Sequence, residues 1–269
     1  MKTCIIIYFL FLFPFTGLAQ VDSVFRFERE WGYQIVDFSV DALGNLYILS
    51  KNDQLKKIDP NGDSVAVFNA VRRYGQLYSI DVTNPLKILL YYKDFGTVLT
   101  LDRFLSVRNT LDLRRQNIFQ VKAVGLAYDN NIWVFDEQEG KLKRLAEDGK
   151  LILQTNDLRL VFDTLPSPDF ITDQDGLVYL YDPNKGVYLF DYYGALKTRI
   201  PFTGWRDFMV VSKTIYGRKE NEMLKYEPGS LDLKQVKIPQ PFQSASRIRI
   251  TQNKLYVLNN GALSVYSMK

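Results

Sequence analysis

The feature that most constrains the fold is a repeat of roughly 42 residues that runs through the chain from about residue 20. The clearest copy is 173–194 (DQDGLVYLYDPNKGVYLFDYYG). Its two apolar and aromatic runs are bounded by Gly, Pro, Asn and Asp, as in a β-meander. Each unit has a central aromatic residue or leucine in its second run, at Tyr47, Leu90, Trp133, Tyr179, Tyr216 and Tyr256. With four strands per unit, the sequence predicts an all-β, six-bladed β-propeller with four-stranded antiparallel blades.

The two ends of the repeat predict how the ring closes. The sixth unit stops after its third strand, at 262–269, and a spare strand precedes the first complete unit, at 23–28 (SVFRFE). We expect this N-terminal strand, with Val24, Phe25 and Phe27, to complete the last blade. Such closure removes the exposed edges that an open sheet would present to other chains.

Two consecutive segments of the first unit carry a family resemblance. The segments 41–49 (DALGNLYIL) and 55–62 (LKKIDPNG) resemble the turn and strand motifs of NHL-like and TolB-like six-bladed β-propellers. The resemblance covers 21–269, although 83–85 (TNP) and 212–214 (SKT) replace the usual D-x-x-G turn in the second and fifth units. It implies a fold that serves many functions and assigns no activity.

The first residues have the composition of a secretory signal peptide. Lys2 precedes an apolar run at 4–15, and small residues lead to Ala19, so we expect cleavage of 1–19 and a single propeller domain over 20–269. Position 20 is Gln, which excludes a lipoprotein, and the one cysteine, Cys4, lies in the leader. The expected product is a periplasmic or secreted monomer that does not span a membrane.

Composition excludes several chemistries. The sequence contains no histidine, which removes the base of Ser-His-Asp and Cys-His sites and the usual zinc ligand. The balance of 34 Lys+Arg against 30 Asp+Glu argues against a nucleic-acid partner. The acidic segments 59–63 (DPNGD), 147–149 (EDG) and 173–176 (DQDG) are interpreted as turns and not as calcium sites. We therefore expect no catalytic residue, no metal and no cofactor.

The connections between blades are the candidate binding face. Each combines arginine with an aromatic residue, two types that are enriched at binding hot spots. The candidates are Arg29, Trp31, Arg72, Arg73, Tyr74, Arg114, Arg115, Phe119, Arg159, Trp205, Arg206, Phe242 and Arg247. A structural alternative is that the aromatic rings cover the core while the arginines extend along its rim.

Two functions fit these observations. The first is a non-enzymatic binding or scaffold module of the bacterial cell envelope, which would hold a protein, peptide or glycan on the Arg/aromatic face. The second is a hydrolase or lyase that acts on a glycan or lactone with carboxylates, with or without Ca²⁺. A central cluster of inward acids would favour the enzyme, and an arginine-lined central channel would count against it.

Overall fold

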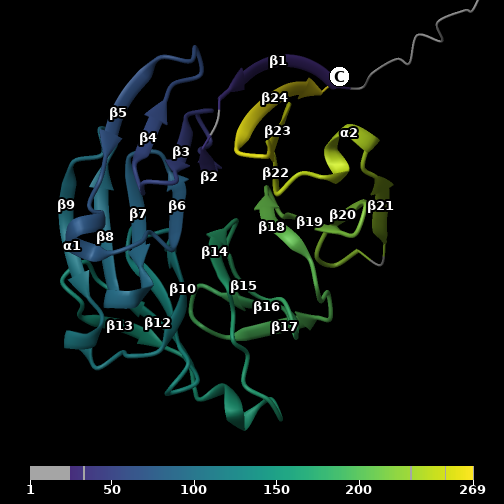
Figure 1. Ribbon diagram of the computed structural model, residues 1–269. Helices are drawn as coiled ribbons and strands as arrows, with labels where there is room; N and C mark the ends of the chain where they lie inside the picture. Colours follow the sequence, from purple (N-terminus) through teal and green to yellow (C-terminus); the bar gives the residue numbers. More distant parts are fainter. Residues whose placement is uncertain (1–24, 33, 231, 252, 269) are drawn as a thin grey trace, which may run out of the picture.

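Six four-stranded antiparallel sheets make up the computed structural model, which describes residues 25–268 except 33, 231 and 252. Each innermost strand contacts the innermost strands of two neighbouring sheets, so the sheets form a closed ring (Figure 1). The prediction of a six-bladed propeller is confirmed. The predicted signal peptide, together with Cys4 and Val24, lies outside the described residues.

The blades follow one another along the chain, each running from its inner to its outer strand. Blade 1 consists of β2 (Ile35–Val40), β3 (Leu46–Ser50), β4 (Leu55–Ile58) and β5 (Ser64–Phe68). Blade 2 consists of β6 (Ser79–Asn84), β7 (Lys87–Tyr92), β8 (Thr97–Asp102) and β9 (Val107–Asp112). Blade 3 consists of β10 (Val121–Leu126), β11 (Ile132–Asp136), β12 (Lys141–Leu145) and β13 (Leu151–Gln154). Blade 4 consists of β14 (Phe170–Gln174), β15 (Leu177–Asp182), β16 (Gly186–Asp191) and β17 (Leu196–Ile200). Blade 5 consists of β18 (Arg206–Val211), β19 (Thr214–Lys219), β20 (Glu222–Tyr226) and β21 (Leu233–Lys237). Blade 6 consists of β22 (Arg247–Ile250), β23 (Lys254–Asn259), β24 (Ala262–Met268) and β1 (Phe25–Trp31).

Helical structure is confined to single turns in loops. These turns are α1 (Val71–Tyr74), η1 (Lys93–Phe95), η2 (Arg114–Gln116), η3 (Leu158–Leu160) and α2 (Gln240–Gln243). Within the described part of the chain, no helix has the length and apolar character needed to cross a bilayer.

Strand β1 closes the ring, as the sequence predicts, but it is longer at its C-terminal end than the expected 23–28. It pairs with β24 from Phe25↔Met268 to Trp31↔Leu263. Because β24 is seven residues long, its outer edge is covered only if β1 continues to Trp31. Arg29 and Trp31 therefore belong to a strand and not, as expected, to a connection.

Burial decreases from the axis to the rim, and this explains the composition of the repeat. The second strand of a blade lies between two neighbouring blades, so β7, β11 and β15 are buried on both faces and consist of nearly continuous apolar residues. Outer strands such as β13 and β21 are mostly exposed. The hydrophobic core consequently forms six clusters, one between each pair of adjacent blades.

The two units that depart from the usual turn still form the same hairpin. In blade 2 the turn is Pro85–Leu86, between β6 and β7, and in blade 5 it is Ser212–Lys213, between β18 and β19. Ser212 has a positive φ of 44°, as Gly44 and Gly176 have in the corresponding turns of blades 1 and 4. Strand pairing across the blade thus compensates for an unfavourable turn residue.

Candidate binding face

One face of the ring carries both the connections between blades and the loops between second and third strands. Main-chain hydrogen bonds join the two kinds of loop in five blades: Leu113 N to Gly96 O, Leu158 N to Gly140 O, Gly204 N to Pro183 O, Ile238 N to Asn221 O and Ile35 N to Gly261 O. In blade 1 the side chain of Asn69 bonds to Asn52 O instead. We call this side of the molecule the connection face.

Three of the candidate aromatic residues point inward. Tyr74, Trp205 and Phe242 are 9%, 5% and 6% exposed. The Trp205 ring stacks on Phe202 at 4.6 Å and fills the space that a side chain at Gly217 would need. These three rings cover the core, as the structural alternative to a binding face states. Phe162, in the connection between blades 3 and 4, is partly buried and packs against the hydrophobic cluster between those two blades.

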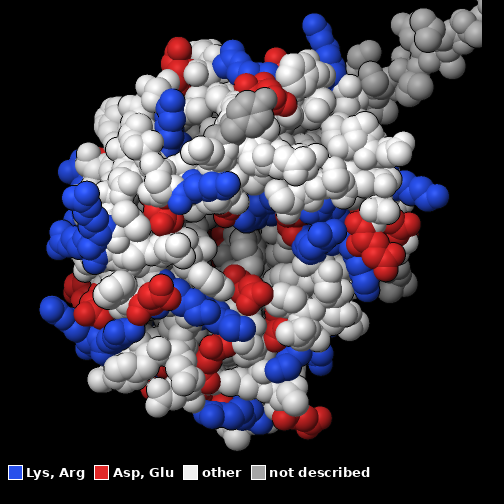
Figure 2. Space-filling view, viewed as in Figure 1, with Lys and Arg blue, Asp and Glu red and all other residues white. Residues whose placement is uncertain are grey.

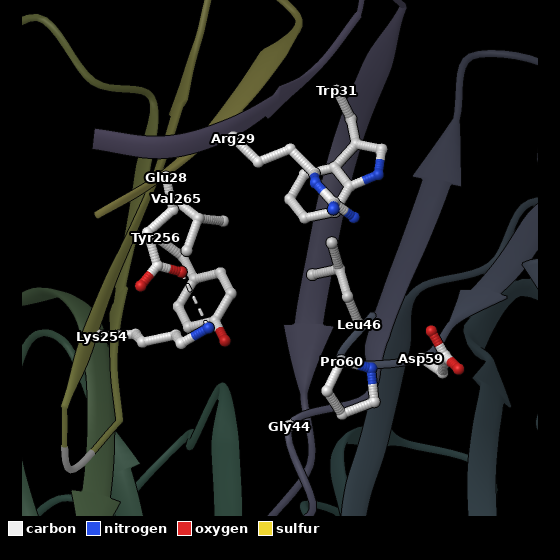
Figure 3. Close-up of a pocket in the computed structure, with 10 residues that line it drawn as sticks. All are labelled: Glu28, Arg29, Trp31, Gly44, Leu46, Asp59, Pro60, Lys254, Tyr256 and Val265. Atoms are coloured by element: carbon white, nitrogen blue, oxygen red, sulfur yellow. Dashed lines mark ion pairs between the residues drawn. The ribbon is translucent and has the colours of Figure 1, made fainter. Parts of the chain in front are cut away.

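Arg29 and Trp31 lie away from the connection face, in the seam between blades 6 and 1. The Arg29 guanidinium donates to Asn61 O at 2.6 Å, in the turn between β4 and β5, and lies 5.7 Å from the Trp31 ring centroid. Figure 3 shows both side chains at a cavity of about 120 Å³, where Lys254 pairs with Glu28 at 2.8 Å. The charged groups of this cavity thus already have partners within the protein.

Other arginines of the candidate set also have partners. Arg159 pairs with Asp157 at 2.9 Å and donates to Glu139 O at 3.0 Å. Arg247 forms an ion pair with Asp37 across the seam between blades 6 and 1. Arg206 is exposed at the start of β18. The candidates therefore do not form one uniform ring.

The remaining candidates come together over blades 1 and 2. Arg72 and Arg73 are exposed on α1, Arg114 and Arg115 are exposed on η2, and Phe119 is 59% exposed. The loop containing η1 joins the two groups. Its Phe95 ring packs over Gly75, and Arg114 packs over Gly96 and donates to Asp94 O at 2.6 Å.

Three residues that the sequence reasoning missed complete this surface. Phe95 and Tyr78 are 50% and 42% exposed, and the Lys93 ammonium lies 4.8 Å from the Tyr78 ring centroid. The segment 93–96 (KDFG) could have been recognised, because in a propeller the loops between second and third strands lie on the same face as the connections between blades. We define the blade 1–2 patch as Arg72, Arg73, Tyr78, Lys93, Phe95, Arg114, Arg115 and Phe119.

The patch is basic and partly apolar. Asp94 lies in η1 and Asp112 ends β9, close in the chain to three of its five basic side chains, and Asp169 and Glu137 act on Tyr78. The Asp112 carboxylate lies 3.4 Å from the side chain of Arg115, which is itself 84% exposed. Exposed pairs of this kind contribute little binding energy. The three exposed rings supply apolar area beside the charges, so the patch can contact an acidic surface and an apolar group at once.

The acidic segments expected to form turns are satisfied by main-chain hydrogen bonds. Asp59 Oδ1 accepts from the amides of Asn61, Gly62 and Asp63 at 3.0, 2.9 and 2.8 Å, and Asp148 accepts from Lys150 at 2.9 Å. These contacts confirm the turn interpretation there. The described residues contain no group of three His, Cys, Asp or Glu side chains placed to hold a metal ion.

Asp173 differs from this expectation. It lies in β14, and its Oδ2 accepts from Trp133 Nε1 at 2.9 Å and from the Tyr128 amide at 3.1 Å, both in blade 3. Burial raises the pKa of this carboxyl group. Asp173 therefore links two blades, and only Asp175 and Gly176, both with positive φ, form the turn.

Known proteins share the fold of this chain with little sequence similarity. No protein-family model matches the sequence, and no curated protein matches it. A streptogramin B lyase structure aligns with a TM-score of 0.62 at 12% identity, over 90% of this chain and 87% of that chain. A catalytically inactive histidine-to-alanine variant of virginiamycin B lyase from Staphylococcus aureus, with quinupristin, aligns with a TM-score of 0.60 at 12% identity, over 88% and 82%.

A protein complex also contains the fold. BBS1N, in a crystal structure with ARL6DN, aligns with a TM-score of 0.59 at 11% identity, over 92% of this chain and 97% of that chain. Identities this low establish architecture alone. The closed ring of six blades and these alignments confirm the β-propeller fold that the sequence predicts.

Proposed function

We propose that the protein is an exported binding module that uses the blade 1–2 patch to hold an acidic partner protein or peptide of the cell envelope. The observation that carries the proposal is the convergence of α1, η1 and η2, which gathers five basic and three exposed aromatic side chains. Arginine and aromatic residues dominate binding energy at interfaces. Clustered positive charge also speeds association with an acidic partner.

Two further observations support a binding role over a catalytic one. The virginiamycin B lyase variant that shares this fold has one histidine replaced by alanine and is catalytically inactive, and this sequence contains no histidine. At the inner strands, Asp37 pairs with Arg247 and Asp207 with Arg218. Because each of these two carboxylates already contacts an arginine of the protein, neither is free of a partner as a catalytic acid would be, which disfavours the alternative of a carboxylate-dependent hydrolase or lyase. BBS1N supports the proposal as a propeller of this fold that was crystallised with another protein.

The test removes positive charge at the patch. The variant carries Arg72→Ala, Arg73→Ala, Arg114→Ala and Arg115→Ala, and the control removes four exposed basic residues elsewhere through Arg26→Ala, Lys197→Ala, Lys234→Ala and Lys237→Ala. Binding of a panel of labelled acidic peptides, with and without aromatic residues, is measured by fluorescence anisotropy. Envelope proteins that co-purify are compared in parallel.

We expect the patch variant to lose at least about tenfold in affinity, with a circular dichroism spectrum like that of the parent protein. The control should bind as the parent does, and added salt should weaken binding because exposed charges are screened. Equal losses in the two variants would show that overall charge, and not the patch, is responsible. Unchanged binding by the patch variant would refute the proposal.

A further inference from the structure

Charged side chains gather where the inner strands meet at the central channel. Strands β2, β18 and β22 all begin at the connection face, and Asp37, Asp207 and Arg247 lie within the first three residues of these strands. Arg249 is the third residue of β22. Figure 2 shows basic and acidic side chains at the edge of a central hollow. This mouth of the channel is distinct from the blade 1–2 patch.

Both acids at the mouth already have arginine partners. Asp37 forms its ion pair with Arg247. Asp207 Oδ2 lies 2.8 Å from Nε of Arg218, which is completely buried and donates to the carbonyl of Ala245 at 2.7 Å. Asp207 holds this position with a positive φ of 55°, next to an irregularity in the pairing of β18 with β19. These contacts join blades 5, 6 and 1 and give each acid an arginine partner, while both acids still act on Arg249 through space.

Arg249 has no acidic partner among the described residues. Its Nη1 donates to Phe208 O at 3.2 Å, and no carboxylate of the described residues lies within ion-pair distance of its guanidinium. Burial, followed by the charge of Arg247, lowers the pKa of Arg249 to about 9, so the group remains protonated at neutral pH. Its side chain still keeps partial solvent exposure, so a ligand that enters the channel can reach it.

Arg247 also has a donor to spare. Its Nε is buried and has no hydrogen-bond partner among the described residues, although another of its nitrogens contacts Asp37. A buried donor without a partner costs free energy, as does a cation held in a poorly hydrated place without a counter-charge. The Nε of Arg247 without a hydrogen-bond partner and the unpaired charge of Arg249 lie two residues apart on β22. Both favour the binding of an anionic ligand.

We propose that the guanidinium groups of Arg247 and Arg249 bind the carboxylate of a small organic acid or of a peptide C-terminus at the mouth of the channel. A guanidinium presents paired N–H donors that match the two oxygens of a carboxylate. The guanidinium of Arg249 carries a positive charge that no carboxylate of the described residues pairs with. A monoanion balances this charge, whereas a phosphate dianion would bring excess negative charge beside Asp37 and Asp207.

The test follows the arginine side-chain Nε–Hε signals by NMR while sodium acetate is added to the ¹⁵N-labelled protein, with sodium chloride at equal ionic strength as the reference. We expect saturable shifts of the Arg247 and Arg249 signals with acetate alone, in the millimolar range of affinity. Arg249→Gln should abolish them, and Arg249→Lys, which keeps the charge without the paired donors, should weaken binding by about tenfold. The matched control is Arg206→Gln, at the start of β18 in the neighbouring blade 5. This variant should bind acetate as the parent protein does.

Thermal unfolding gives an independent readout. Acetate should raise the Tm of the parent protein above that in chloride, because a ligand that binds only the native state stabilises it, and it should leave the Tm of Arg249→Gln unchanged. The Arg249→Gln variant should fold, since Arg249 has no acidic partner to lose. If it does not fold, Arg249→Lys replaces it in this measurement and should show a smaller rise of the Tm with acetate than the parent protein. Arginine signals that move no further with acetate than with chloride would overturn the proposal.

Short peptides distinguish the two sources of carboxylate. A tripeptide with a free C-terminus should compete with acetate, and the same tripeptide with an amidated C-terminus should not. If the free peptide binds more tightly than acetate, the site recognises a chain end, and if it binds less tightly, the site recognises a free small acid. Equal binding of the acid and the amide would refute a carboxylate site. Patch variants should leave all these results unchanged, so failure here is separable from failure of the proposed function.

Discussion

Tyr179 and Tyr181 lie two residues apart on β15, and both are buried, yet their hydroxyl groups have opposite surroundings. The Tyr181 hydroxyl donates to Trp205 O at 2.9 Å and accepts from Trp205 N at 2.6 Å. The Tyr179 hydroxyl has no partner among the described residues. Tyr181 thus connects blade 4 to the connection that leads into blade 5, whereas Tyr179 contributes only its ring.

Replacement of each tyrosine by phenylalanine should separate these roles. Tyr181→Phe leaves two buried main-chain groups of Trp205 without a partner and should lower the free energy of unfolding by about 1–3 kcal/mol. Tyr179→Phe removes an unsatisfied hydroxyl and should leave stability unchanged or slightly higher. Urea denaturation followed by tryptophan fluorescence measures both. Equal destabilisation by the two substitutions would contradict the hydrogen-bond assignment.

Closure of the ring depends on a single element, strand β1. It covers the edge of β24, and its Phe25 ring contacts Phe242 at 5.4 Å while Phe27 contacts Tyr266 at 5.7 Å. Without β1, blade 6 would keep three strands and expose the main-chain groups of β24. An exposed strand edge promotes pairing with another chain.

Deletion of the chain through residue 31 should therefore destabilise the protein by more than about 3 kcal/mol and cause self-association. The matched control begins at residue 25 and should behave as the longer chain does. Size-exclusion chromatography with light scattering and thermal unfolding report the two effects. A synthetic peptide of residues 25–31, added in excess, should partly restore the Tm. A truncated protein that stays monomeric with an unchanged Tm would refute closure by β1.

At the scale of the whole molecule, buried tyrosines govern the response to pH. Burial raises the pKa of Tyr179, Tyr181 and Tyr256 to about 12, and it also raises the pKa of Tyr47, Tyr91 and Tyr92. The unfolded chain releases these protons near pH 10, whereas the native protein retains them. The native state therefore binds more protons between about pH 10 and 12, and the free energy of unfolding falls as pH rises through that window.

We expect nearly constant stability from about pH 7 to 9, because the sequence has no histidine, and a steep loss above about pH 10. Arg249, Arg218 and Lys57 act in the opposite direction, since burial lowers the pKa of each and their deprotonation favours the native state, but they are three groups against the six tyrosines. Urea midpoints across this range, together with phenolate absorbance, provide the measurement. Phenolate absorbance that reaches its full amplitude before unfolding would show that the buried tyrosines are not protected.

The sequence by itself determined the architecture. A central residue repeated at Tyr47, Leu90, Trp133 and Tyr179 predicts second strands buried on both faces, and these four residues are 0% exposed. Hairpins form from residues close in the chain, so their signal is local and can be recognised without a structure. Closure by the N-terminal strand also followed from counting strands, although its end at Trp31 depended on the length of β24.

Only the tertiary structure decided which arginines are available to bind. Arg29 and Arg159 resemble Arg72 and Arg73 in the sequence, but the first two contact Asn61 and Asp157 while the other two are exposed on α1 in the blade 1–2 patch. The unpaired Arg249 at the channel mouth was likewise invisible, because its neighbours Phe208 and Arg247 come from two different blades. The physical reason is distance along the chain: a strand depends on adjacent residues, whereas the partner of a long charged side chain is set by how the closed ring brings separate blades together.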